Sequence, residues 1–203
     1  MLRPGVLLLL LIPVLYFGCK RNQGYEENLQ EHRNAIDVFF ADPKMSPLSD
    51  AAIKDFKGLS YFEPDKAFIV NAVVEKFSEK KVIEIPHTLN RKYPFYIWGK
   101  AHFKLLNDSC HLYIYLSVQQ EEEHKQEATL FIPFHDATNG NETYGAGRYL
   151  DVPIPKDSLI TLDFNYAYNP DCAYSDNYSC PIIPVENTLK IPVRAGVKRF
   201  DLR

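Results

Sequence analysis

The chain has 203 residues, of which 46% are hydrophobic and 24% are charged. This length predicts one domain of roughly 150 to 180 residues behind an N-terminal extension, large enough to bury a core without metal or disulfide staples, and the 13% aromatic content excludes a disordered chain. The net charge of -3 and the pI near 6.1 leave no basic surface for a phosphate backbone, so nucleic acid is excluded as a partner.

Residues 1–18 have the pattern of an export signal. Arg3 precedes the apolar run Val6–Phe17, which is shorter than the roughly 20 apolar residues that a membrane-spanning helix needs. Because Cys19 directly follows Gly18, the segment resembles a bacterial lipoprotein signal, in which the cysteine is acylated and becomes the new N-terminus. An ordinary cleaved signal and a plain signal anchor are the alternatives.

Lipidation at Cys19 predicts where the protein resides. Acyl chains contribute about 0.8 kcal/mol per buried methylene, and two or more of them anchor a protein stably. Residues 19–24 would form a tether and residues 25–203 a single β-rich domain. We therefore expect a protein of the bacterial cell envelope, anchored to the membrane by lipid and facing the periplasm.

Two helices are predicted ahead of the β-rich part. Apolar residues recur at helical spacing over Tyr25–Asp42, and Pro43 ends the helix. A second, short helix is indicated by Ser49 as N-cap and Gly58 as the C-terminal stop. Nothing in these two helices suggests chemistry, so we expect them to pack on the sheet.

Beyond Gly58 the hydrophobic period changes to the two-residue alternation of strands. The strand-like stretches are Lys66–Phe77, Lys81–Ile85, Phe95–Leu105, Cys110–Val118, Ala128–His135, Leu159–Asn165 and Leu189–Arg194. The charged run Gln119–Glu127 is expected as a solvated hairpin tip. The fold is therefore predicted to be mainly β (α+β): an antiparallel β-sandwich or barrel of about seven strands with one or two N-terminal helices packed on it.

Three cysteines remain once Cys19 is assigned to lipid. Cys110 is in phase with the apolar residues of its strand and is expected in the core. Cys172 and Cys180 are then the natural disulfide pair of an exported protein, and their bridge would stabilise it by about 2.5 kcal/mol in the chain-entropy model.

Two polar segments could carry a site, and the first is Phe134–Asp151. Gly140, Gly145 and Gly147 allow sharp turns or close approach to a ligand, and Arg148 offers donors to a carboxylate or phosphate. The glycine spacing is not that of a dinucleotide-binding fold, and we predict no cofactor.

The second segment is Asp163–Asn187, which is rich in proline, asparagine and tyrosine. Strand alternation places Asp163 and Asn165 in a polar row that leads into the turn at Asn169. Loops of this kind often carry binding or catalytic groups. The alternative is a loop tied down by its own backbone hydrogen bonds and a disulfide.

Three stretches, PFHDATNGNETYGAGRYLDVP, LDFNYAYNPDCAYSDNYSCPIIPVENTL and VRAGVK, resemble the bacterial domain-of-unknown-function family 1684 (DUF1684). The resemblance covers roughly Glu31–Lys198. Members often are secreted or lipid-anchored proteins, and no activity can be carried over. The resemblance implies that both polar segments belong to one constellation.

The leading hypothesis is a domain that binds a small polar or anionic ligand between residues 136–151 and 163–187. Arg148 would clamp an anion, while Asp163, Asn165, Glu186 and Asn187 would fix the ligand. The predicted ligand-binding residues are Asp136, Thr138, Thr143, Tyr144, Arg148, Tyr149, Asp163, Asn165, Asn169, Tyr174, Glu186 and Asn187. A buried arginine among carboxylates can equally be a structural ion pair, so the ligand hypothesis requires a pocket beside it.

Two other classes of function stay open. An enzyme would use Cys172 as nucleophile, with His135 or Arg148 to favour its thiolate, or would hold a metal with the same thiols. The spacing of Cys172 and Cys180 is wider than that of common zinc sites, and we predict no metal. An interaction protein without a ligand site would instead expose an aromatic patch, for which Tyr96 and Trp98 are the candidates.

Overall fold

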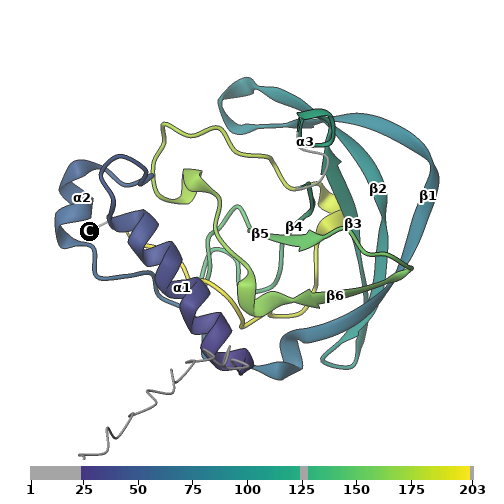
Figure 1. Ribbon diagram of the computed structural model, residues 1–203, viewed down its shortest axis with the longest axis horizontal. Coiled ribbons are helices and arrows are strands. Elements are labelled where there is room, and N and C mark those ends of the chain that lie inside the picture. The colour runs from purple at the N-terminus through teal and green to yellow at the C-terminus, as the bar shows by residue number, and fades with distance from the viewer. Residues whose placement is uncertain (1–23, 124–127, 202–203) are drawn as a thin grey trace, which may run out of the picture.

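The strands form one antiparallel sheet in the order β5-β4-β3-β2-β1-β6 (Figure 1). The computed structural model describes residues 24–123 and 128–201. The strands are β1 Ile69–Pro86, β2 Lys92–Leu105, β3 Asp108–Ser117, β4 Thr129–Phe134, β5 Arg148–Pro153 and β6 Leu159–Asp163. The sheet curves until it is nearly a barrel, so the predicted mainly β fold with N-terminal helices is confirmed in its barrel form.

The chain that follows β6 completes the curved sheet. β5 and β6 are the two edge strands. Tyr168, shortly after β6, exchanges two backbone hydrogen bonds with Tyr149 of β5, at 2.9 and 3.0 Å. Their rings also make an edge-to-face contact, with centroids 5.8 Å apart. The loop that begins after Asp163 therefore starts at the seam where the two edges of the sheet approach each other.

Two irregularities bend the long strands. The predicted strands Lys66–Phe77 and Lys81–Ile85 are parts of the single strand β1, whose register with β2 shifts between Lys76 and Lys81. A second shift lies between Ile97 and Gly99, where β2 pairs with β3. A Cβ atom on Gly99 would lie 2.8 Å from the carbonyl oxygen of Glu75, so only glycine fits at this approach.

The shift at Gly99 decides where Tyr96 and Trp98 lie. A register shift in one strand changes which side chains face the core. Tyr96 and Trp98 are partly buried and pack against the main core, while Phe95 packs in a separate cluster with Ile85. These two aromatic residues therefore do not form the exposed patch that would indicate a docking protein.

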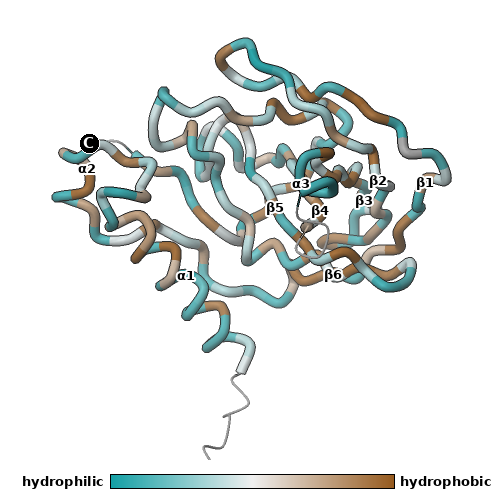
Figure 2. Tube along the Cα trace, turned by 45° about the horizontal axis from the view of Figure 1, so that its top comes forward, coloured by the Kyte–Doolittle hydropathy of each residue, from teal (hydrophilic) through white to brown (hydrophobic). Residues whose placement is uncertain are grey.

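The main core lies inside the curved sheet. In Figure 2, apolar and polar residues alternate along the strands, as expected of elements with one buried and one exposed face. Cys110 packs against this core as predicted. The fully or nearly fully buried residues of the main core include Ala72, Leu105, Leu112, Ile114, Leu130, Ile132, Phe134, Leu162, Phe164, Val193 and Ala195.

The helices α1 (Tyr25–Ala41) and α2 (Asp50–Asp55) lie at one end of the molecule (Figure 1). Both were predicted from the sequence, and the Ser49 hydroxyl accepts the predicted capping hydrogen bond from the Ala52 N–H at 3.2 Å. Phe40 of α1 packs edge-to-face on Tyr174, with ring centroids 4.6 Å apart. This contact attaches α1 to the loop after β6.

Two element predictions were wrong. Leu189–Arg194 is irregular rather than a strand, and Arg148–Pro153, which we did not predict as a strand, is β5. The charged run predicted as a solvated hairpin tip does connect the antiparallel strands β3 and β4, but there Val118–Glu123 forms the short helix α3, with a side-chain hydrogen bond of 3.1 Å from Gln119 to Glu123. The end of that predicted tip, residues 124–127, lies outside the described residues.

Candidate functional site

Arg148, at the first position of β5, is fully buried, and its guanidinium is surrounded by acceptors from the protein itself. One terminal nitrogen donates to Asp136 Oδ2 at 2.9 Å and to the Val193 carbonyl at 2.7 Å. The other donates to the carbonyls of Ala195 and Val197. Burial lowers the pKa of the guanidinium, and the Asp136 carboxylate opposes that shift. Arg148 thus binds the C-terminal segment.

Asp136 connects this ion pair to the turn after β4. Its Oδ1 atom accepts from the backbone N–H of Thr138 at 2.8 Å, from the Thr138 hydroxyl at 2.6 Å and from the Val193 N–H at 3.0 Å. The Thr138 hydroxyl also lies 2.8 Å from that of Thr143. The predicted residues Asp136, Thr138, Thr143 and Arg148 therefore do meet, as one hydrogen-bonded network in the interior.

The Asn187 side chain hydrogen-bonds to backbone groups of β3 and β4 where these two strands are poorly paired. Only Tyr115 and Phe131 pair between β3 and β4. The Asn187 side chain accepts from the Tyr113 N–H at 2.8 Å and donates to the carbonyls of Tyr113 and Pro133, at 2.9 and 2.7 Å. It thus satisfies backbone groups that a regular ladder would pair. The neighbouring Glu186 is exposed.

Asn165 has a similar structural role. Its side-chain oxygen accepts from the Asp65 N–H at 3.0 Å, and its amide nitrogen donates to the Asp65 carbonyl at 3.0 Å and to Asp163 Oδ1 at 2.9 Å. This arrangement copies a backbone ladder between the loop after β6 and the segment before β1. Asp163 and Asn165 therefore hold this loop in place, as the structural alternative predicts.

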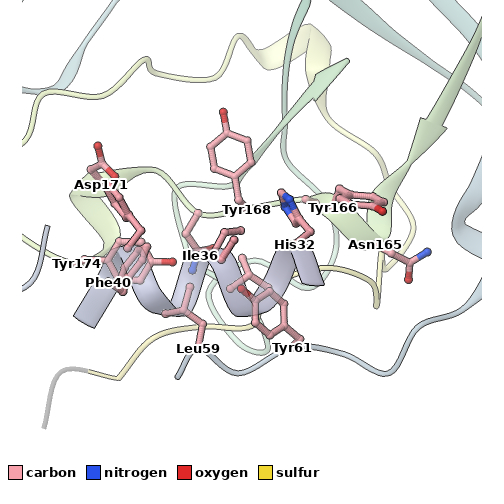
Figure 3. A pocket seen from close by; sticks show the side chains of 15 residues that line it. His32, Ile36, Phe40, Leu59, Tyr61, Asn165, Tyr166, Tyr168, Asp171 and Tyr174 are labelled. Atoms are coloured by element: carbon pink, nitrogen blue, oxygen red, sulfur yellow. The ribbon is translucent and has the colours of Figure 1, made fainter. Parts of the chain in front are cut away.

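A pocket lies between α1 and the loop after β6, and we call it the α1 pocket. Its volume is about 410 Å³. In Figure 3, His32, Ile36 and Phe40 follow one another along α1 beside the pocket. The lining residues are His32, Ala35, Ile36, Phe39, Phe40, Leu59, Tyr61, Asn165, Tyr166, Ala167, Tyr168, Asn169, Asp171, Tyr174 and Val197. His32, Ala35 and Phe39 are exposed and mark its open side.

An unpaired acceptor lies in the wall of this pocket. Asn169 is only 4% exposed. Its amide nitrogen donates to the Lys198 carbonyl at 3.1 Å, but its Oδ1 atom has no hydrogen-bond partner among the described residues, and neither has the Tyr61 hydroxyl. Buried polar atoms without partners are rare in proteins, since each costs free energy. Asn169 Oδ1 and the Tyr61 hydroxyl are therefore the two buried polar atoms without a partner among the described residues that line the pocket.

The α1 pocket contains only part of the predicted site. Of the predicted residues, Asn165, Asn169 and Tyr174 line it, while Arg148 and its network do not. The contributions of α1, Leu59 and Tyr61 were missed, because we expected no chemistry from the N-terminal helices. One signal was present in the sequence: Ile36, Phe39 and Phe40 share one helix face by their spacing, and Phe39 remains exposed on it.

The predicted thiol chemistry has a partial counterpart. Cys172 and Cys180 are free thiols that lie side by side, so the predicted disulfide remains a prediction. Tyr144 donates to the Cys172 carbonyl at 3.3 Å, and the Tyr149 hydroxyl donates to the Pro181 carbonyl.

No group of three or more His, Cys, Asp or Glu in residues 24–123 and 128–201 is placed to hold a metal ion.

The fold and the pocket define a β-barrel-like domain with an N-terminal helix that forms one wall of a small-molecule-sized pocket. The chain belongs to the family described as "Protein of unknown function (DUF1684)", whose model matches residues 54–198. The predicted family membership is therefore confirmed.

A solved structure supports the same assignment. The solution NMR structure of the uncharacterized protein from gene locus rrnAC0354 of Haloarcula marismortui is 36% identical to this chain, with a TM-score of 0.67. The match covers 86% of this chain and 94% of that one. No curated protein matches the chain. Among the helices of the described residues, none combines the length and the hydropathy that a membrane span requires.

The Arg148 network generates a prediction about stability. Arg148→Met leaves the buried Asp136 carboxylate without its countercharge, so we expect a loss of about 3–5 kcal/mol in the free energy of unfolding, measured by urea denaturation. Adding Asp136→Asn to this variant removes the unpaired charge and should recover part of the loss.

The matched control is Arg194→Met, which removes an exposed ion pair with Glu142, 2.9 Å long. Solvent screens that pair, so the unfolding midpoint should change little. Equal effects of Arg148→Met and Arg194→Met would contradict a structural role for Arg148.

Proposed function

We propose that this protein is a binding domain that takes up a small, uncharged and mainly apolar molecule in the α1 pocket. The observation that carries the proposal is the unpaired Oδ1 atom of Asn169, a residue that lines this mainly apolar pocket. The ligand would place its apolar body between α1 and the loop after β6, and would donate one hydrogen bond from a hydroxyl or N–H group to Asn169.

The size and lining of the pocket support such a ligand. A volume of about 410 Å³ lies at the lower end of the roughly 300–1,000 Å³ typical of small-molecule sites. Aromatic rings from both walls, among them Phe40, Tyr166 and Tyr174, offer flat apolar surfaces. Small-molecule sites commonly combine such a lining with a few placed polar groups, which is the role assigned to Asn169.

The charges around the pocket disfavour an anion. No lysine or arginine is among the lining residues, whereas the exposed carboxylate of Asp171 is. Desolvation and the neighbouring Arg33 lower the pKa of His32, so its ring is neutral at pH 7. The anionic ligand predicted from Arg148 would have no countercharge here. The geometry therefore favours the α1 pocket and an uncharged ligand over a site built on Arg148.

The proposal is tested with three probes that share a methylphenyl body, in NMR titrations that follow the Ile36 and Val197 methyl groups. 4-Methylphenol carries a donor, toluene lacks it, and 4-methylbenzoate carries a negative charge. We expect 4-methylphenol to bind more tightly than toluene by about tenfold, which is the value of one hydrogen bond to a buried acceptor. 4-Methylbenzoate should bind most weakly.

Three variants test whether the probes bind in the α1 pocket or elsewhere on the protein. Asn169→Leu should remove the preference for 4-methylphenol over toluene, and Ala35→Trp should fill the pocket and weaken both probes. Ala41→Trp, on the same helix but outside the pocket, should leave binding unchanged. Shift changes that concentrate around Arg148 instead, or survive Ala35→Trp, would refute the α1 pocket as the site.

We also propose that the domain works at the cell envelope, held by lipid on Cys19. Residues 1–18 and Cys19 lie outside the described residues, so the support is the export-signal pattern of the sequence. Gly24, where the described chain begins, is exposed at the N-terminus of α1, so a tether can leave the domain without crossing the pocket wall.

The anchoring proposal predicts the fate of Cys19→Ser. In cells the wild-type protein should fractionate with membranes and carry acyl chains on its N-terminal peptide by mass spectrometry. Cys19→Ser should lose the acyl mass and leave the membrane fraction, while Cys110→Ser should behave like wild type. A wild-type N-terminal peptide that begins beyond Cys19, without lipid, would rule out the anchor.

A further inference from the structure

Cys172 and Cys180 lie in contact at the edge of the loop after β6. The backbone N–H of Cys172 donates to Cys180 Sγ at 3.2 Å. The Tyr144 hydroxyl, from the turn before β5, lies 3.9 Å from Cys172 Sγ and 3.3 Å from the Cys172 carbonyl oxygen. The Cys180 sulfur is thus held against the backbone of Cys172, and the Cys172 sulfur is contacted by Tyr144 from a second segment.

The two thiols differ in their solvent exposure and in how firmly their backbone is held. Cys172 is half-buried, whereas Cys180 is only 6% exposed. Cys180 is also fixed by its backbone: its N–H donates to the Thr88 hydroxyl at 2.9 Å, and its carbonyl accepts from the Thr88 N–H at 2.9 Å. An external molecule therefore meets Cys172 first, with Cys180 held behind it.

The surroundings favour the thiolate of Cys172. The pKa of Cys172 is lowered because Cys180 donates a hydrogen bond to its sulfur, and Tyr144 adds a second donor, while burial and the nearby Asp171 carboxylate oppose the shift. Burial raises the pKa of Tyr144 to about 12, so its hydroxyl keeps the proton that it donates. The pKa of Cys110, in contrast, is raised by burial.

We propose that Cys172 and Cys180 form a reactive dithiol that undergoes thiol–disulfide exchange with the disulfides of small thiols. Cys172 attacks first and Cys180 resolves. This activity is separate from ligand binding in the α1 pocket and does not depend on it.

The reaction has two balanced steps. The Cys172 thiolate attacks one sulfur of a small disulfide RSSR, which forms a mixed disulfide and releases RS⁻. Cys180 then gives its proton to that thiolate and attacks Cys172 Sγ, which releases the second RS⁻; the Cys172 proton lost to solvent at the start neutralises it. The protein dithiol loses two electrons and RSSR is reduced to two RSH. An excess of RSH reverses both steps.

The test uses the full chain, reduced and then treated with oxidised glutathione at pH 7, with acid quenching and peptide-resolved mass spectrometry. Wild type should form the Cys172–Cys180 bridge without accumulating an adduct. Cys180→Ser should trap one glutathione on Cys172. In Cys172→Ser, Cys180 should react at least about tenfold more slowly, and Cys110 in wild type should be as slow, because attack requires an accessible thiolate.

Tyr144→Phe tests how Cys172 is activated. Loss of the donor should raise the pKa of Cys172, so the midpoint of its alkylation rate against pH should move upward and the rate at pH 7 should fall several-fold. Phe62→Leu, away from this loop, serves as a control for general destabilisation.

Three results would overturn the proposal: equal reactivity of Cys172 and Cys180, a Cys172 no faster than Cys110, or a bridge in the folded wild type that reduced glutathione does not open. Opening of the wild-type bridge by reduced glutathione can be measured without any substitution, so it tests the proposal even where a cysteine variant fails to fold.

Discussion

The buried ion pair between Arg148 and Asp136 joins parts of the chain that the sheet leaves separate. Burying a charge is costly unless it is paired and hydrogen-bonded, and here the guanidinium meets one carboxylate and three backbone carbonyls. These carbonyls belong to residues 193–197, which are therefore irregular. Val197, fixed in this way, donates its N–H to the Ala167 carbonyl at 2.9 Å and lines the α1 pocket. The ion pair thus positions one wall of the candidate site.

Three buried asparagines differ in how many hydrogen bonds their side chains make, and this difference separates a structural role from a possible contact with a ligand. Asn165 and Asn187 use both ends of their amides on backbone groups of other segments, so they replace strand pairing where it is missing. Asn169 satisfies only its nitrogen. The same residue type is therefore structural at two positions and available at the third, and the difference lies in the partners rather than in the sequence.

The sequence predicted what local patterns determine: α1, the Ser49 cap, most strands, the core position of Cys110 and the family. It could not predict the irregular course of 193–197, because the partners of Arg148 are backbone carbonyls, which have no sequence signature. The face of Tyr96 and Trp98 depends on a register shift at Gly99. The α1 pocket needs Ile36, Tyr61 and Asn169 together, and only the tertiary fold brings such distant residues to one cavity.

We propose that the ligand site lies between α1 and the loop after β6, with Asn169 as its polar contact. The most direct test is a crystal structure of the protein purified from its native cells without unfolding, at a resolution that shows ordered water. We expect a bound molecule in the α1 pocket with a donor on Asn169 Oδ1. A molecule bound at the Arg148 guanidinium, or a pocket filled by a protein side chain, would contradict it.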